Sequence, residues 1–262
     1  MPNAIEIAEY TRLRDIVAKL RAPDGCPWDR EQTHTSLRPH LLQEAYEVLH
    51  LLDEGDTQHM PEELGDLLFQ IVLHTQLAEE AGEWSMSDVL SSLSDKLVRR
   101  HPHVFGDVAL TTSGEVVAQW DELKKKERAP DASALASVPA GLPALSYAQE
   151  LLRRAEAAGF AWPHRDDVLE KLHEEVAELA DAPSNEAALE ELGDILFNVV
   201  NYARYLGLDA EDALRAAGHK FRRRFGGVEQ LVASSDSGTM KGMTRDELMA
   251  LWGQVKATEV QK

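Results

Sequence analysis

The sequence predicts an all-α protein made of a tandem repeat of two helical bundle domains. Apolar residues recur at helical spacing along most of the chain, and the two halves of the sequence resemble each other. Aromatic residues make up only 6% of the 262 residues, while Ala, Leu and Glu are abundant, which favours helix. Hydrophobic residues reach 44%, so each half can build a core of its own.

Three long helices are expected in the first half, over residues 6–21, 36–53 and 61–81. Each range places its apolar side chains three or four positions apart, so that they fall on one face of a helix. Gly55 and Gly82 stand where the second and third of these helices should end, because glycine readily adopts the left-handed conformation found after a helix C-terminus.

Further helices are expected to begin at three pairs of residues with the spacing of a capping box. In each pair a Ser or Thr is followed three positions later by an acidic residue, and together they satisfy the first free N–H groups of a helix. The pairs are Ser85 with Asp88, Thr112 with Glu115 and Thr244 with Glu247. Gly207 marks an expected helix end in the second half.

The clearest break in the helical pattern is the segment APDASALASVPAGLP, which begins at Ala129. Its three prolines and many small residues make it a poor helix and a plausible linker. We therefore predict an N-terminal helical domain over residues 1–129, a linker over 130–143 and a C-terminal helical domain over 144–262.

The two halves match in four blocks, at an offset that stays between about 124 and 132 residues. The most specific match is EELGDLLF against EELGDILF, which is too close for two unrelated amphipathic helices. The paired blocks are residues 41–52 with 171–182, 62–77 with 190–205, 94–106 with 218–229, and 119–127 with 251–259. The pattern indicates an internal duplication.

In the second half, acidic residues recur three positions apart on two successive predicted helices. Glu175 and Glu178 share one face of the first helix, and Glu191 and Asp194 share one face of the next. The connection between the helices, residues 181–185, is short enough for them to pack as an antiparallel hairpin. Four carboxylates are then expected to converge.

Such a cluster needs a positive partner, because neighbouring carboxylates repel each other and raise each other's pKa. Hard oxygen ligands of this kind suit Mg²⁺ or Mn²⁺, whereas the single cysteine, Cys26, and the lack of well-placed histidines argue against zinc. The alternative is an acidic face that only meets solvent, but the cluster occurs twice. Apolar neighbours are expected to anchor the acidic helix in a core: Leu192, Ile195, Leu196 and Phe197.

A basic island follows in the second half, at Lys220 and residues 222–224. Lys220 and Arg224 lie four positions apart and share a helix face, as expected if they neutralise polyphosphate oxygens. Cations that stabilise a helix C-terminus are the alternative. Trp252 either stacks on a base or fills the core.

The residues at this point resemble a known family. Glu174-Glu175-x-x-Glu178, followed after a spacer by Glu191-x-x-Asp194, resembles the signature of the MazG family of all-α nucleoside triphosphate pyrophosphohydrolases. GCPWDREQTH at residues 25–34 and RRHPHVFGD at 99–107 resemble the long, two-domain bacterial members. The resemblance extends over nearly the whole chain, including the duplication.

The resemblance implies hydrolysis of nucleoside triphosphates, ATP among them, to the monophosphate and pyrophosphate by a homodimer that requires Mg²⁺, with Mn²⁺ as a substitute. It implies that the metal ligands are Glu175, Glu178, Glu191 and Asp194. It also implies that the nucleotide is bound by Lys171, Glu174, Glu190, Lys220, Arg223, Arg224 and Trp252. We expect catalytic roles for Glu174, Glu175, Lys220 and Arg224, with Glu174 as a general base outside the metal's ligands.

The first half departs from the signature at Gln43, which stands where the first Glu of the pair is expected. An amide cannot act as a base, so catalysis is expected mainly in the second half. A second site in the first half, with a weaker, regulatory or structural role, would comprise Glu44, Glu47, Glu63, Asp66, Lys96, Arg100 and Trp120.

Other classes of function are less well supported. The net charge of −19 argues against a nucleic-acid partner, and no run of about 18 apolar residues indicates a membrane span. A charged N-terminus without a signal peptide and the single cysteine favour the cytoplasm. A di-iron site at Glu47 and His50 is disfavoured because Asp181 stands where its second histidine would be. A nucleotide sensor or partner-binding module without turnover, and a purely structural helical scaffold, remain as alternatives.

Overall fold

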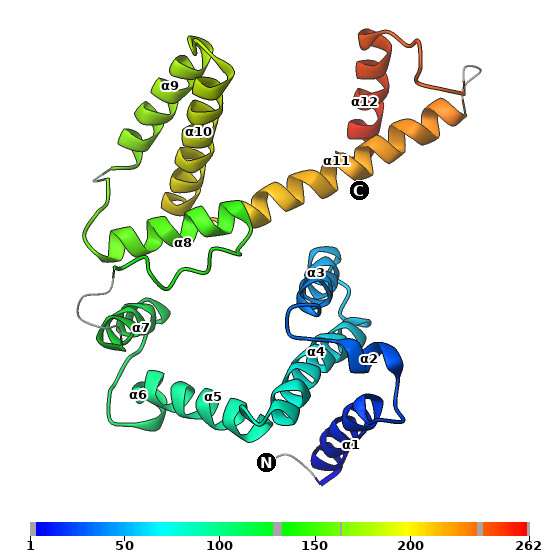
Figure 1. The fold of residues 1–262 in the computed structure, drawn as a ribbon. Coiled ribbons are helices and arrows are strands. Elements are labelled where there is room, and N and C mark those ends of the chain that lie inside the picture. Colours follow the sequence, from blue (N-terminus) through cyan, green and yellow to red (C-terminus); the bar gives the residue numbers. More distant parts are fainter. Residues whose placement is uncertain (1–3, 128–132, 163, 235–237, 261–262) are drawn as a thin grey trace. The chain divides into compact units, whose positions relative to one another are not determined.

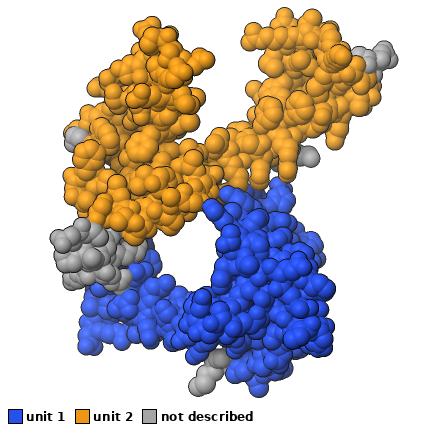
Figure 2. All heavy atoms as spheres, viewed as in Figure 1, with its two compact units in different colours: residues 1–124 blue, residues 125–262 orange. Residues whose placement is uncertain are grey.

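The computed structural model describes residues 4–127, 133–162, 164–234 and 238–260. Within these ranges the chain forms twelve α-helices and no strand, which confirms the predicted all-α class (Figure 1). The chain divides into two compact units, Met1–Lys124 and Lys125–Lys262 (Figure 2). None of the helices in the described ranges is long and apolar enough to cross a lipid bilayer.

The first unit is built around an antiparallel hairpin of α3 and α4, with α1 packed on α4 (Figure 1). Its core consists of Val17, Leu37, Val72, Leu73 and Met86, all at most 3% exposed. The helices are α1 (Ala4–Arg21), α2 (Pro27–Glu31), α3 (Arg38–Glu54), α4 (Met60–Ala81), α5 (Met86–Arg100), α6 (Pro102–Phe105) and α7 (Ser113–Glu127).

The local signals in the sequence place the helix ends correctly. Gly55 and Gly82 follow α3 and α4 in the left-handed conformation, with φ of 69° and 70°. Ser85 and Asp88 form the predicted capping box at the start of α5. The pairs at Thr112 and Thr244 make the corresponding hydrogen bonds ahead of α7 and α12.

The second unit contains a second antiparallel hairpin, formed by α9 and α10 and closed by the four residues 181–184 (Figure 1). Helix α8 packs on α10, and α12 packs on α11. A small core joins α8, α10 and the start of α11 through Leu152, Val200 and Ala210. The helices are α8 (Ala144–Ala157), α9 (Arg165–Ala180), α10 (Asn185–Tyr205), α11 (Ala210–Ala233) and α12 (Arg245–Val260).

One expectation about α10 is wrong. Leu192, Leu196 and Phe197 do not anchor this helix in a core: they are 45%, 48% and 36% exposed in the chain by itself. The core contacts of α10 are made farther along the helix, at Val200 and Ala203, where α8 packs against it. An apolar face of α10 is therefore left uncovered by the described residues of the second unit.

The predicted linker is partly integrated into the second unit. Residues 133–143 contain no α-helix, in agreement with their prolines, but Val138 is buried and Ser137 accepts a hydrogen bond from Arg154 of α8. Helix α8 begins at Ala144, where the C-terminal domain is predicted to begin. The predicted boundary near residue 129 lies outside the described residues.

Candidate metal and nucleotide site

Three carboxylates meet where α9 and α10 face each other. Glu175 and Glu178 come from α9 and Glu191 from α10, and one oxygen of each lies within 4.8 Å of the others. The spacing of three residues puts the first two on one side of α9, and the short turn after Ala180 brings α10 alongside. Glu175 is the most enclosed of the three, at 4% exposed.

Lys171 is paired with this cluster. Its Nζ lies 3.0 Å from Oε1 of Glu174 and 2.9 Å from Oε1 of Glu175. The hydrogen bond from Lys171 is the main cause that lowers the pKa of Glu175, and the same pair of contacts raises the pKa of Lys171. Lys171 and Glu175 are thus held in their charged forms.

Glu191 is influenced in the opposite direction. Burial, followed by the hydrogen bond to Glu175 and the charges of Glu178, Glu175 and Asp194, raises its pKa above the ordinary value. The neighbouring negative charges thus add to the effect of burial at Glu191, and a bound cation would offset them. Asp194, the fourth predicted ligand, is exposed one turn along α10 and does not belong to the group within 4.8 Å.

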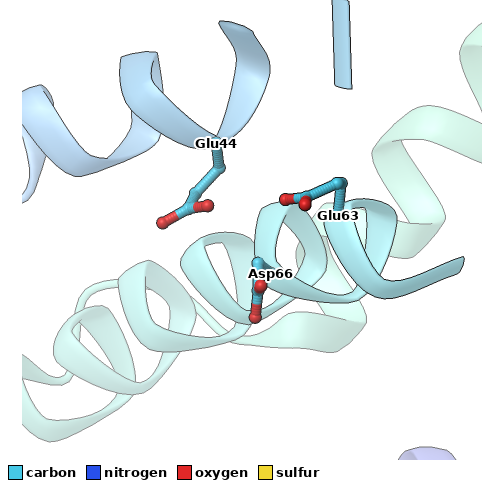
Figure 3. A group of neighbouring side chains, drawn as sticks. All are labelled: Glu44, Glu63 and Asp66. Atoms are coloured by element: carbon cyan, nitrogen blue, oxygen red, sulfur yellow. The ribbon is translucent and has the colours of Figure 1, made fainter. Parts of the chain in front are cut away.

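The first unit repeats the arrangement between α3 and α4. Figure 3 shows Glu44 extending from α3 toward Glu63 and Asp66 on α4, and one oxygen of each lies within 4.8 Å of the others. Burial is the main cause that raises the pKa of Glu44 and of Glu63, and neighbouring acids add to it. Glu47 lies outside this group of three and accepts a hydrogen bond of 3.0 Å from Gln43.

The two clusters differ in their partners. In the register that aligns Glu44 with Glu175, the position of Lys171 is occupied by His40 and that of Glu174 by Gln43. The His40 ring packs edge-on against Trp28, with 5.5 Å between ring centroids. The C-terminal cluster therefore has a lysine cation beside it, whereas the equivalent places in the first unit hold an imidazole and a neutral amide.

The predicted nucleotide-binding residues of the second unit fall into two sets. Lys171, Glu174 and Glu190 lie on the α9–α10 hairpin with the carboxylates, whereas Lys220, Arg223, Arg224 and Trp252 lie on α11 and α12. Among the described residues, the second set makes its contacts within its own helix pair and is not joined to the carboxylates.

The contacts of that second set link α11 to α12. Arg223 and Arg224 both pair with Glu259, and the Trp252 ring lies 5.5 Å from that of Phe221. Glu259 was not predicted as a site residue. The signal for it was present, because Glu127 holds the same place seven residues after Trp120 that Glu259 holds after Trp252.

In the first unit, the equivalents of these residues lie on α5 and α7. The indole Nε1 of Trp120 donates a hydrogen bond of 2.8 Å to the carbonyl oxygen of Arg100, so this tryptophan is fixed against the end of α5. Lys96 is exposed on α5, one turn before Arg100. The first unit thus keeps the tryptophan and the basic residues, although its acidic cluster is altered.

Fold and site together define a class: an all-α protein that repeats an acidic helical hairpin whose oxygen ligands suit a hard divalent cation. The profile of the MazG nucleotide pyrophosphohydrolase domain matches residues 32–105 and 164–228, the two segments that carry the hairpins. The chain belongs to the MazG family.

Three similar proteins extend this comparison. The nucleoside triphosphate pyrophosphohydrolase of Escherichia coli is 44% identical over 96% of this chain and 98% of its own length. The nucleoside triphosphate pyrophosphohydrolase/pyrophosphatase MazG of Thermotoga maritima is 40% identical over 94% of this chain and 95% of its own length. An uncharacterized Bacillus subtilis protein, YabN, is 43% identical over 96% of this chain but only 52% of its own length.

Proposed function

We propose that this protein is a nucleoside triphosphate pyrophosphohydrolase, which converts NTP or dNTP and water to the nucleoside monophosphate and pyrophosphate. The observation that carries the proposal is the group of Glu175, Glu178 and Glu191 with Lys171 beside it. The relatives from E. coli and T. maritima carry this activity in their names. Control or cleaning of the cytoplasmic nucleotide pool is the role we assign to it.

The carboxylate group fits a hard divalent cation. Its donors are all carboxylate oxygens within 4.8 Å of one another, the ligand type that Mg²⁺ and Mn²⁺ prefer, and burial together with the neighbouring acids raises the pKa of Glu191. We assign Glu175, Glu178, Glu191 and Asp194 as the residues that hold it. When bound, the ion supplies Lewis acidity toward phosphoryl oxygens and a more acidic water.

Glu174 is the residue we assign as general base. It lies outside the group of three carboxylates, its side chain is 55% exposed, and its pairing with Lys171 orients it. Water attacks the α-phosphorus while its proton passes to the Glu174 carboxylate. The bond from the α-phosphorus to the bridging oxygen breaks, and pyrophosphate leaves with that oxygen.

Cations are needed for the leaving group, because the departing pyrophosphate gains negative charge. We assign this role to Lys220 and Arg224, with Arg223 and Glu190 as further contacts and Trp252 as a surface for the base. These residues meet the carboxylates once substrate, or a second copy of the chain, brings the α11–α12 pair to the α9–α10 hairpin.

A homodimer accounts for the uncovered face of α10. Leu189, Leu192, Leu196 and Val199 recur at the spacing of a helix–helix seam and are between 44% and 72% exposed. The same spacing recurs on α4, where Leu64, Leu68 and Ile71 are also exposed. Seams of this kind are self-complementary when two copies pack with twofold symmetry.

In the first unit we propose weak turnover or none. Gln43 replaces the general base, and it donates a hydrogen bond to Glu47 instead of accepting a proton. Metal and nucleotide binding at Glu44, Glu63, Asp66, Lys96, Arg100 and Trp120 remain compatible with this arrangement. The first unit would then serve a structural or regulatory purpose.

The decisive experiment is release of pyrophosphate from each common NTP and dNTP with Mg²⁺. Glu175→Ala removes the most buried ligand of the C-terminal cluster, and Glu44→Ala is the matched change in the N-terminal one. We expect Glu175→Ala to lose at least about a hundredfold in kcat, as is typical when a preorganised charge-stabilising group is removed, and Glu44→Ala to stay close to wild type. A wild-type protein that releases no pyrophosphate from any of these substrates contradicts the proposal.

A further inference from the structure

Glu259 joins two consecutive arginines at the contact between α11 and α12. Its Oε1 accepts a hydrogen bond of 2.9 Å from Nε of Arg223, and its Oε2 accepts one of 2.7 Å from Nε of Arg224. Each carboxylate oxygen thus serves one guanidinium. The Glu259 side chain is only 24% exposed, although it lies near the end of the last helix.

The bridge determines what the two guanidinium groups present to their surroundings. Consecutive residues of a helix project about 100° apart, so Arg223 and Arg224 would diverge without a common anchor. Each arginine uses its Nε–H toward Glu259, and among the described residues the structure shows no acceptor for the other N–H groups of both planar forks, so they can serve a ligand. The arginines also lower the pKa of Glu259, Arg224 most strongly, so the bridge stays charged.

Space for an acceptor exists beside the bridge. A cavity of about 500 Å³ is lined by Arg223, Glu259, Gln230, Thr258 and Val255. Its polar lining consists mostly of groups that donate hydrogen bonds to oxygen: a guanidinium, an amide and a hydroxyl. A group rich in negatively charged oxygens would suit the guanidinium group of Arg223 in its lining, and Arg224 is tied to Arg223 through Glu259.

The internal repeat contains the same combination of residues. Arg99 and Arg100 occupy the positions of Arg223 and Arg224, and Glu127 follows Trp120 at the distance at which Glu259 follows Trp252. The Glu127 side chain lies outside the described part of the chain, so the correspondence is one of sequence. The glutamate accompanies the arginine pair in both halves, including the half whose acidic cluster has changed.

We propose that Glu259 is a positioning residue that holds Arg223 and Arg224 as a double-arginine clamp for the diphosphate group that leaves during hydrolysis. Glu259 itself touches neither substrate nor product in this assignment; it acts through the two arginines. The inference rests on the proposed function, because it names the part of the site that receives pyrophosphate.

The chain offers a matched control in Glu150 on α8. Glu150 also bridges two consecutive arginines through their Nε atoms, at 2.7 Å to Arg153 and 2.6 Å to Arg154. Its side chain is 26% exposed, close to the 24% of Glu259. Glu150→Gln therefore removes a similar bridge of similar exposure from a helix to which we assign no part in the reaction.

The experiment compares Glu259→Gln, Glu259→Asp and Glu150→Gln with wild type in the full-length chain. Binding of inorganic pyrophosphate with Mg²⁺ is measured by calorimetry, kcat and KM for NTP by pyrophosphate release, and folding by thermal melting. We expect Glu259→Gln to weaken pyrophosphate binding and lower kcat by about tenfold each, with KM changed less, because charge-assisted contacts to the leaving group are misaligned. Glu259→Asp should recover part of the loss, and Glu150→Gln should match wild type in binding and rate.

Other outcomes overturn the inference. If Glu259→Gln binds pyrophosphate like Glu150→Gln, the bridge is merely structural, and if it binds more tightly, the carboxylate competes with phosphate for the arginines. Wild type that binds no pyrophosphate also overturns it. Wild type that binds pyrophosphate but releases none from any nucleotide contradicts the proposed function alone, and the binding comparison still decides the role of Glu259. Should Glu259→Gln not fold, the Glu259→Asp variant carries the same comparison.

Discussion

The positive charge of Lys171 offsets part of the negative charge of the C-terminal carboxylate cluster in the absence of a ligand. Glu175 is almost fully buried, and burial of a carboxylate without a partner is costly. The ammonium group at 2.9 Å offsets that cost and keeps Glu175 ionised, as its lowered pKa indicates. Glu191 has no such direct benefit, and its pKa is raised. Neighbouring carboxylates in one site thus have opposite pKa shifts.

This balance leads to a prediction for Lys171→Met. Without the lysine, the repulsion among the carboxylates is uncompensated until a cation binds, so added Mg²⁺ should stabilise the variant more than wild type. We expect the variant to melt about 3 °C lower than wild type without metal, and to regain most of the difference with saturating Mg²⁺. Melting curves with and without Mg²⁺ provide the measurement.

The control for Lys171→Met is Lys256→Met, which removes an exposed lysine from α12. Both substitutions change the net charge equally, so a general effect of charge on melting would appear in both. A Lys171→Met protein whose melting temperature responds to Mg²⁺ no more than that of Lys256→Met would show that the lysine and the metal do not compensate the same charges.

The contacts of Lys171 could be predicted from the sequence, whereas those of Glu259 could not. The contact of Lys171 with Glu174 and Glu175 is local, at helical spacings of three and four residues, so the sequence contained it. The bridge from Glu259 to Arg223 and Arg224 connects residues about 35 apart and depends on how α12 packs on α11. In the sequence, only the equivalent position of Glu127 in the internal repeat indicated that Glu259 belongs with the site residues.

At the scale of the helix, the uncovered seam of α10 is the most informative feature. Periodicity in the sequence identified its apolar face correctly but not what covers that face, since packing within a chain and packing between chains require the same side chains. Three of the four predicted carboxylates of each acidic hairpin do lie together, whereas Asp194 and Glu47 lie outside the groups. The spacing of three residues along each helix and the short connection between the helices determine where these carboxylates lie. That geometry does not depend on what packs against the outer face of the hairpin.

For this seam we expect Leu196→Asp to convert the proposed homodimer to a monomer. The substitution places a carboxylate in the middle of a row of apolar side chains that is 44% to 72% exposed in the single chain. An exposed position costs little folding energy, whereas a charge buried at an interface core is strongly unfavourable. Light scattering after size-exclusion chromatography gives the mass of the species in solution.

The matched control is Leu208→Asp, in the turn after α10. Leu208 is 52% exposed, close to the 48% of Leu196, but it lies outside the seam. We expect this variant to remain dimeric. If wild type is itself a monomer, or if Leu196→Asp keeps the wild-type mass, α10 is not the dimer contact.

At the scale of the whole molecule, the chain carries one hairpin twice with different polar residues. The second copy has Lys171 and Glu174, whereas the first has His40 and Gln43 at the same places. Each copy brings three carboxylates together, but the third member differs: it is Asp66 in the first copy and Glu178, the counterpart of Glu47, in the second. The family signature predicted the difference at Gln43 but not the one at His40, and the structure adds that the His40 ring packs against Trp28.

This comparison predicts that a lost activity can be restored. In a Glu175→Ala background, the double change His40→Lys and Gln43→Glu gives the first unit the residues that distinguish the second. We expect pyrophosphate release to rise at least about tenfold over the Glu175→Ala parent, which is at the low end for an added general base. The control carries His40→Lys with Gln43→Ala, and equal rates in both would show that position 43 does not supply the base.

The segment before α8 has a practical consequence for separating the two halves. A cut at the predicted boundary, just ahead of Ala144, would discard Ser137, which pairs with Arg154, and Val138, which is buried. The resulting fragment would begin with α8 but would lack the residues before it that contact this helix. A piece meant to report on the second half alone should therefore retain the chain from residue 133 onward, so that its behaviour reflects the site and not a frayed first helix.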